Sequence, residues 1–195
     1  MVQGQLLEDS ERGKILKDIL FNYNPKTILE IGTWKGLGST KCIVDNITEN
    51  VEFISIESNK EFYDIAKQNL YNYTNKVNLL YGKIVEVSEI NDFINGKNLT
   101  LEQRVWLKED IENLNKCENI LDILPKKIDF LLLDGGEFST YPEWLKLKNR
   151  CKIVALDDNR ELKTKQIHSE LLNDNEYQLI TQTDEGNGFS VFIKK

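Results

Sequence analysis

Residues 27–39 read Thr-Ile-Leu-Glu-Ile-Gly-Thr-Trp-Lys-Gly-Leu-Gly-Ser. The apolar run Thr27–Ile31 is typical of a short buried strand, and the glycines that follow allow the backbone to turn tightly. A helix is expected next, over residues 37–47, and its N-terminus offers free N–H groups. A strand, a glycine turn and a helix in this order are typical of an open α/β sheet, which binds ligands at the carboxyl ends of its strands.

The rest of the chain continues this alternation of strands and helices. Further strands are expected at 51–56, 77–81, 128–133, 152–156, 177–182 and 189–193, and further helices at 9–22, 60–70, 142–149 and 160–173. The alternation predicts an α/β fold, with a Rossmann-like, doubly wound, mostly parallel seven-stranded sheet and a C-terminal antiparallel hairpin strand.

We expect one domain over residues 1–195, with a helical insert at about 84–124. One apolar helix face is expected in the insert, formed by Leu107, Ile111, Leu114 and Leu121. Residues 91–99 are expected to form a loop, and the charges of 108–118 a solvated face.

The composition narrows the classes of partner. The chain has 195 residues and a formal net charge of −7, which argues against nucleic acid and anionic membranes as partners. No apolar run is long enough for a transmembrane helix, and Met1–Ser10 lack the apolar core of a signal peptide. The three cysteines are far apart and odd in number, which is typical of reduced thiols in a cytoplasmic protein. A homo-oligomer is left open.

A second ligand-binding feature follows the second predicted strand. Glu57 stands at the end of 51–56, about 20 residues after the glycine turn. An acidic side chain at this place can accept hydrogen bonds from both hydroxyls of a ribose. The spacing therefore predicts a nucleoside site, although the glycines could instead shape only a turn and Glu57 only cap a helix.

The segment Leu29–Gly36 resembles motif I of the class I S-adenosylmethionine (SAM)-dependent methyltransferases, in which an acidic residue, any residue, Gly, three residues and Gly follow one another. The resemblance implies that Glu30 lies near the methionine end of SAM and that Glu57 holds the ribose. The segment Tyr81–Ile84 is similar to the family's adenine-side loop. The cofactor-binding residues implied in this way are Glu30, Gly32, Thr33, Gly36, Ser39, Glu57 and Gly82.

Two alternatives remain open. Gly32, Gly36 and Gly38 also fit the glycine turn of NAD(P)-dependent oxidoreductases of the short-chain type, but the Tyr-x-x-x-Lys pair of that family is matched only by Tyr63 and Lys67, one helix after the glycines. The other alternative is a catalytically silent SAM-binding module whose insert contacts a partner protein.

Acidic residues also follow the strands predicted at 128–133 and 152–156. They are Asp134, Asp157, Asp158 and the amide Asn159. Neighbouring carboxylates repel one another unless a cation or protons intervene, and oxygen ligands suit Mg²⁺ or Ca²⁺. The arrangement resembles the metal-dependent O-methyltransferases of the catechol and sugar-modifying types, which implies Mg²⁺ bound by Asp134 and by Asp157-Asp158 or Asp158-Asn159.

This second resemblance implies O-methylation of a small hydroxylated acceptor, such as a sugar, a glycan precursor or a secondary metabolite. The catechol type has a basic lysine three residues after the first aspartate, where this chain has Glu137. We therefore assign Asp134 and Glu137 as catalytic residues, with Glu137 as the candidate general base. The alternative for Asp134, Asp157 and Asp158 is that they cap helices.

Overall fold

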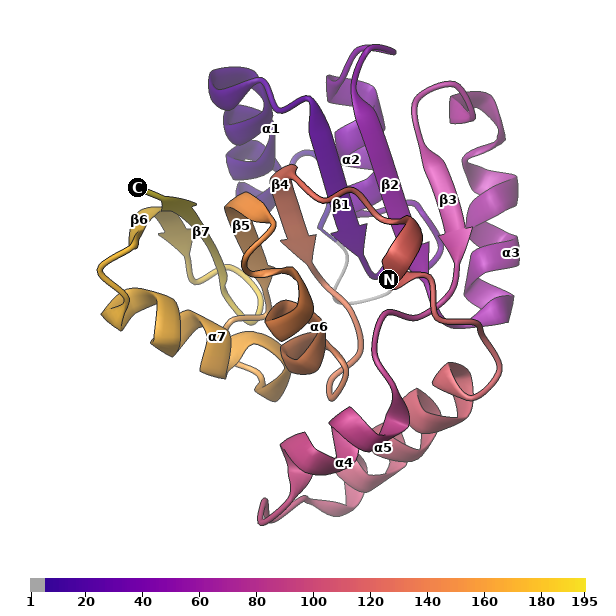
Figure 1. The fold of residues 1–195 in the computed structure, drawn as a ribbon. Helices are drawn as coiled ribbons and strands as arrows, with labels where there is room; N and C mark the ends of the chain where they lie inside the picture. The colour runs from indigo at the N-terminus through magenta and orange to yellow at the C-terminus, as the bar shows by residue number, and fades with distance from the viewer. Residues whose placement is uncertain (1–5) are drawn as a thin grey trace.

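The computed structural model describes residues 6–195, and a seven-stranded sheet forms its centre (Figure 1). The strands are β1 (Thr27–Ile31), β2 (Glu52–Glu57), β3 (Asn78–Tyr81), β4 (Ile128–Leu133), β5 (Cys151–Asp157), β6 (Tyr177–Thr183) and β7 (Phe189–Lys194). Their order is β3-β2-β1-β4-β5-β7-β6, and only β7 runs antiparallel to its neighbours. The predicted α/β fold is therefore confirmed, including the hairpin strand at the C-terminus.

Helices cover both faces of the sheet, as a doubly wound fold requires. The helices α1 (Glu11–Tyr23), α2 (Ser39–Asn46) and α3 (Lys60–Asn69) belong to one face. The helices α6 (Thr140–Leu147) and α7 (Leu162–Asn173) pack on the other face. Residues 1–5 lie outside the described residues. They belong to the expected single domain and to the segment Met1–Ser10, in which no signal peptide is expected.

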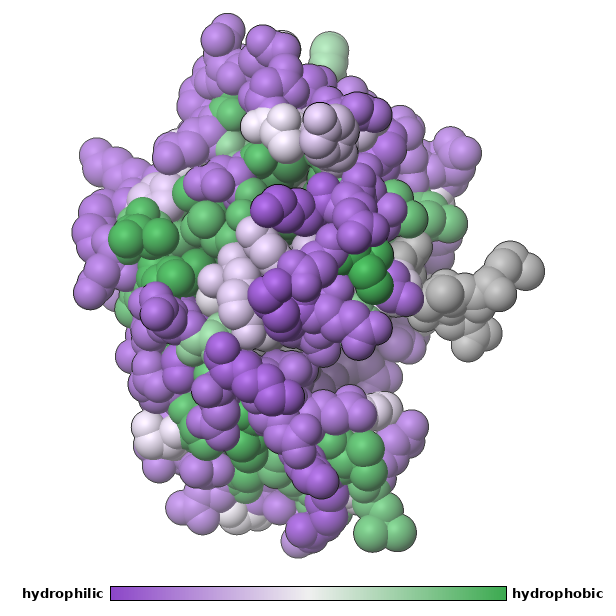
Figure 2. All heavy atoms as spheres, turned by 90° about the vertical axis from the view of Figure 1, so that its right-hand side faces the viewer, coloured by the Kyte–Doolittle hydropathy of each residue, from purple (hydrophilic) through white to green (hydrophobic). Residues whose placement is uncertain are grey.

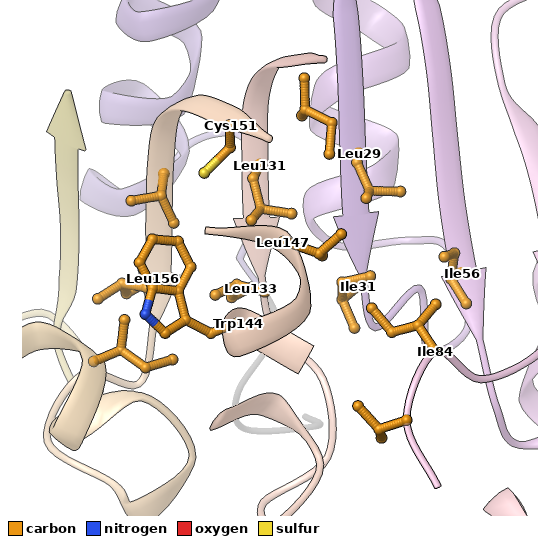
Figure 3. Packing of buried hydrophobic residues seen from close by; sticks show 14 of the residues in the cluster. Leu29, Ile31, Ile56, Ile84, Leu131, Leu133, Trp144, Leu147, Cys151 and Leu156 are labelled. Carbon is orange, nitrogen blue, oxygen red and sulfur yellow. The ribbon is translucent and has the colours of Figure 1, made fainter. Parts of the chain in front are cut away.

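The alternation of side chains along each strand divides the core into two layers. Leu29 and Ile31 of β1 face the layer under α6, to which Trp144 and Leu147 of that helix also belong (Figure 3). Ile28 faces the other layer, under α1 and α2. The last four residues of β4 are fully buried, as is typical of a central parallel strand with helices on both faces.

The segment between β3 and β4 carries two helices, α4 (Val87–Ile94) and α5 (Leu101–Leu114). The expectation of a loop over 91–99 was wrong in its first part, because α4 extends to Ile94. A capping box between Glu86 and Glu89 and the burial of Ile90 stabilise this short helix. The predicted helix face was also too long, since α5 ends at Leu114 and Leu121 begins a separate 3-10 turn (Leu121–Ile123).

Both helices of the insert lie beyond the carboxyl ends of β1, β2 and β4, at the bottom of Figure 1. The molecular surface on the side of β3 and α3 is mostly hydrophilic (Figure 2). None of the helices described within residues 6–195 combines the length and the apolar character that a membrane crossing would need.

Candidate active site

A cavity of about 490 Å³ lies at the carboxyl ends of β1, β2 and β4. Residues from these strand ends form one wall, and residues 109–113 of α5 form the opposite wall. The volume lies within the range of roughly 300–1,000 Å³ that is typical of small-molecule sites. The crevice expected from the alternating sequence is therefore present, and helix α5 of the insert forms one of its walls.

The glycine turn after β1 forms the inner end of the cavity. Gly32 has a φ of +96°, and a Cβ at this position would overlap the backbone carbonyl oxygen of Asp134. The N–H groups of Gly32 and Thr33 donate to the carbonyl oxygen of Ile56, at 3.0 and 3.2 Å. The turn thus lies tightly between β4 and β2, which only glycine permits at position 32.

Glu57 lies at the end of β2 and lines the cavity, as the sequence predicts. Its carboxylate accepts the Trp34 N–H at 2.7 Å and the Asn59 N–H at 2.8 Å, one on each oxygen. Each oxygen retains a second lone pair, so the group can still accept hydrogen bonds from a ligand. Burial raises the pKa of Glu57 to about 7.

Trp34 is held in an unusual conformation beside Glu57. Its φ is +49°, which is rare for a bulky side chain, and its ring packs edge-on against Phe62 with the centroids 6.0 Å apart. The ammonium of Lys35 lies 4.6 Å from the same ring. Both aromatic rings line the cavity, so they offer an apolar surface next to the Glu57 carboxylate.

Glu30 lies buried behind the glycine turn. Its side chain is fully buried and accepts hydrogen bonds from the hydroxyls of Ser39 (2.6 Å), Thr40 (2.7 Å) and Ser55 (2.5 Å). It does not line the cavity. Burial raises the pKa of Glu30, whereas the three hydroxyls lower it.

The seven predicted cofactor-binding residues therefore divide into two groups. Gly32, Glu57 and Gly82 line the cavity. Glu30, Thr33, Gly36 and Ser39 lie behind it. The second group ties the turn and the start of α2 to the sheet, so its members hold the cavity wall in shape.

Sequence reasoning missed four acidic residues of the cavity wall, which are Glu109, Asp110, Glu112 and Glu143. Burial shifts the pKa of two of them. Asp110 of α5 accepts the Phe138 N–H at 3.0 Å, and burial raises its pKa to about 6. The expectation of a solvated face over 108–118 is therefore wrong for Asp110. Glu143 of α6 is 5% exposed, and its Oε2 has no hydrogen-bond partner among residues 6–195. Burial, followed by the charge of Asp110, raises the pKa of Glu143 to about 8.

A signal for Glu143 was present in the sequence. It lies three residues after Thr140 and four residues before Leu147, and both of these neighbours are fully buried. Helical spacing therefore places this carboxyl on the inward face of α6. No such signal existed for Asp110, because its contact to residue 138 depends on how the insert folds back over the strand ends.

The ionisable side chains described in the cavity wall are all acidic. Six carboxyl side chains line it, from Glu57, Glu109, Asp110, Glu112, Asp134 and Glu143. Among its described lining residues there is no lysine, arginine or histidine. The cavity therefore favours a cationic or neutral ligand over an anionic one.

The raised pKa values predict how stability depends on pH. Glu57, Asp110 and Glu143 hold protons in the folded chain at pH values where the unfolded chain has released them. We therefore expect the free energy of unfolding to fall between about pH 5 and about pH 8, by up to about 1.4 kcal/mol per pH unit for each group. Urea denaturation across this range measures the decline.

The variant Glu143→Gln removes one of these groups, so its decline should be shallower than that of the wild type above about pH 5. The control is Glu52→Gln, at the exposed start of β2, which should leave the decline unchanged. An equal slope in Glu143→Gln and the wild type would contradict the assignment of a raised pKa to Glu143.

The acidic residues at the ends of β4 and β5 meet, as expected from the parallel strands. One oxygen each from Asp134, Asp157 and Asp158 lies within 4.8 Å of the others. Two basic side chains already contact them. The Lys163 ammonium lies 2.6 Å from Asp134 Oδ1 and 2.8 Å from Asp158 Oδ2. The Arg12 guanidinium lies 2.9 Å from Asp157 Oδ1.

The remaining two predicted residues lie to either side of this cluster. The amide oxygen of Asn159 is directed at the backbone of Gly188, in the turn between β6 and β7. Glu137 accepts the Leu162 N–H at 3.1 Å, at the first residue of α7, and it does not line the cavity. Burial raises its pKa to about 7. In this structure the Glu137 carboxyl caps a helix.

Comparison with known proteins finds similarity in structure only. No family model matches the chain, and no curated protein matches its sequence. A methyltransferase from Geobacter sulfurreducens superposes with a TM-score of 0.66 at 13% identity, over 96% of this chain and 80% of that one. A putative caffeoyl-CoA O-methyltransferase from Staphylococcus aureus gives 0.61 at 18% identity, over 93% and 82%.

A third similar structure carries a bound ligand. The O-methyltransferase from Bacillus cereus, solved in complex with SAH, superposes with a TM-score of 0.63 at 16% identity, over 94% of this chain and 80% of that one. The strand order, the antiparallel β7 and the similarity over nearly the whole described chain agree with one another. The protein therefore has the fold of the methyltransferases, with its cavity at the carboxyl ends of the central strands.

Proposed function

We propose that this protein is a SAM-dependent methyltransferase that methylates a hydroxyl oxygen of a small acceptor, such as a sugar, a glycan precursor or a secondary metabolite. The observation that carries the proposal is the cavity with Gly32 at its inner end, Glu57 at the end of β2 and six carboxyl groups in its wall. The bound SAH and SAM of similar O-methyltransferase structures support the choice of cofactor.

The charge of the cavity favours SAM over a nicotinamide dinucleotide. SAM carries a sulfonium and a net positive charge, whereas NAD(P) carries at least two phosphate charges. A phosphate about 6 Å from an ionised carboxylate costs about 3 kcal/mol at an effective dielectric constant of 20. Among the described lining residues there is no basic side chain that could bind such a phosphate directly. The oxidoreductase alternative is therefore the weaker one.

The proposed reaction moves one methyl group and one proton. The acceptor oxygen attacks the methyl carbon, the carbon–sulfur bond breaks, and SAH leaves with both electrons of that bond. The acceptor proton passes to a carboxylate or to water. The protein mainly positions the two reactants. Asp134 lines the cavity and can orient the acceptor. Glu137 accepts the Leu162 N–H on one oxygen only, so its second oxygen can still take a proton. We retain both residues in the proposal, with Glu137 as the candidate base.

The remaining expectations are part of the same proposal. Residues 1–195 act as one domain, and the insert at about 84–124 covers the cavity. The three buried free cysteines and the acidic net charge favour a cytoplasmic protein that binds neither nucleic acid nor membranes. A homo-oligomer stays open.

Isothermal titration calorimetry tests the choice of cofactor. We expect SAM and SAH to bind and NAD to give no heat of binding. The variant Glu57→Ala should weaken SAM binding by about 1–3 kcal/mol, through lost ribose hydrogen bonds. The control Glu52→Ala changes an exposed carboxylate at the opposite end of the same strand and should bind as the wild type does. Unchanged affinity in Glu57→Ala would remove this residue from the site.

Release of SAH distinguishes an enzyme from a silent SAM-binding module. A panel of sugars, phenols and other hydroxylated acceptors is incubated with the protein and SAM, and SAH is quantified by chromatography. We expect at least one acceptor to increase SAH formation over the acceptor-free rate. SAM binding without SAH release from any acceptor in the panel would support the silent module instead.

A further inference from the structure

The structure assigns to Lys163 the role of a built-in cation at the ends of β4 and β5. Its ammonium lies between Asp134 Oδ1 (2.6 Å) and Asp158 Oδ2 (2.8 Å), and its side chain is 9% exposed. We infer that this ammonium replaces the Mg²⁺ that the acidic cluster suggested, so that the cluster binds no divalent metal. The part of the inference that concerns turnover rests on the proposed methyl transfer.

The donor atoms of the cluster are already engaged. Asp134 and Asp158 share the Lys163 ammonium, and Asp157 contacts the Arg12 guanidinium at 2.9 Å. Two positive side chains therefore face three carboxylates, and little negative charge remains for a metal. A divalent ion between Asp134 and Asp158 would also meet the ammonium that already occupies this position, which Coulomb repulsion opposes. The residues present do not fit a bound Mg²⁺.

Two hydrogen bonds at the start of α7 fix the position of the Lys163 backbone. The residue before it, Leu162, donates its N–H to Glu137 Oε1 at 3.1 Å. The residue after it, Thr164, donates its hydroxyl to the backbone carbonyl of Asp157 at 2.8 Å. Hydrogen bonds of both neighbouring residues therefore fix the backbone at Lys163, from which its side chain extends to the strand ends.

This arrangement gives Glu137 a structural role besides the proposed role of a base. The carboxyl stabilises the first turn of the helix that carries Lys163, where an acceptor of N–H groups is favourable. The Lys163 ammonium in turn forms an ion pair with Asp134, and Asp134 lines the cavity. Lys163 is thus a positioning residue, which acts on the cavity through Asp134, and it does not itself line the cavity.

Binding of Mn²⁺, followed by electron paramagnetic resonance without SAM or acceptor, tests the inference. Mn²⁺ reports on Mg²⁺ sites because both ions prefer oxygen ligands. We expect no stoichiometric binding by the wild type. Lys163→Met frees Asp134 and Asp158, and one oxygen each of these two residues and of Asp157 lies within 4.8 Å of the others. The variant should therefore bind Mn²⁺ at least about tenfold more tightly than the wild type does.

Matched variants separate this effect from a general loss of charge. Lys163→Arg keeps a cation in place and should bind no more Mn²⁺ than the wild type. Lys165→Met removes an exposed lysine two residues away on α7 and should also resemble the wild type. Far-ultraviolet circular dichroism checks that each variant is folded.

Two outcomes would overturn the inference. One is stoichiometric Mn²⁺ binding by the wild type that Asp158→Asn removes, since this would mark a metal site despite Lys163. The other is a folded Lys163→Met that gains no Mn²⁺ affinity. If Lys163→Met does not fold, the wild-type titration still decides. Where an acceptor is found, turnover should be unchanged in EDTA. Because Mn²⁺ binding is measured without SAM, failure of the proposed methyl transfer would be seen separately, as absent SAM binding or absent SAH release.

Discussion

Replacement of Gly32 by alanine should abolish SAM binding and lower the free energy of unfolding by about 2–5 kcal/mol. Two costs add at this position. The backbone has a φ of +96°, which side chains rarely adopt, and the new Cβ would overlap the carbonyl oxygen of Asp134. Because that carbonyl is backbone, the clash cannot be relieved by a rotamer change, and the end of β1 must shift away from β4. Urea denaturation and calorimetry with SAM measure the two effects.

A second glycine supplies the matched control. Gly96, between α4 and α5, also has a positive φ, of +77°, but no atom lies within 4 Å of the place where its Cβ would be. Gly96→Ala should therefore cost only the backbone part, about 1–2 kcal/mol, and should leave SAM binding unchanged. Equal destabilisation by the two substitutions would mean that the clash with Asp134 is not what requires glycine at position 32.

Replacement of Arg12 by methionine should destabilise the protein by about 3–5 kcal/mol. Arg12 belongs to α1, and its buried guanidinium contacts Asp157 at 2.9 Å. The Asp157 side chain is fully buried, and its second oxygen has no hydrogen-bond partner. Without Arg12 this carboxylate has to be buried with less compensation, which costs more than the pair itself contributes. Burial raises the pKa of Asp157 to about 8, so chemical denaturation at about pH 9, where this carboxylate is ionised, measures the loss.

A double substitution tests this explanation. In Arg12→Met with Asp157→Asn the uncompensated charge is gone, so much of the lost stability should return. Lys14→Met, on the exposed side of α1, is the single-site control and should have little effect. If the double variant is as unstable as Arg12→Met alone, the destabilisation comes from lost packing of the arginine and not from the charge of Asp157.

Much of the fold could be predicted from local patterns. Alternating strands and helices, the apolar run of β4 and the separate pair β6 and β7 indicated a doubly wound sheet with an antiparallel end, and the structure has it. The insert was predicted less well, because α4 is only eight residues long and contains Asn91 and Asp92, which are poor helix formers. Its stability comes from the capping box and from the buried Ile90, that is, from tertiary packing.

The site was predicted where a strand end determines the position of a residue. Gly32, Glu57 and Asp134 follow strands directly, and all three line the cavity. Glu30 also belongs to β1, but alternation along the strand turns its carboxylate away, toward the hydroxyls of Ser39 and Thr40. A resemblance in sequence could not show this direction, because the partners of Glu30 become visible only when α2 is packed.

By itself, the sequence determined the order of strands and helices, the glycine turn and the row of acids at the strand ends, because each depends on residues close together in the chain. Only the tertiary structure decided what neutralises those acids. Lys163 meets Asp134 across 29 residues, and Arg12 meets Asp157 across 145. Such pairs form only when α1 and α7 pack on the two faces of the sheet, because ion pairing depends on distance in space and not on separation along the chain.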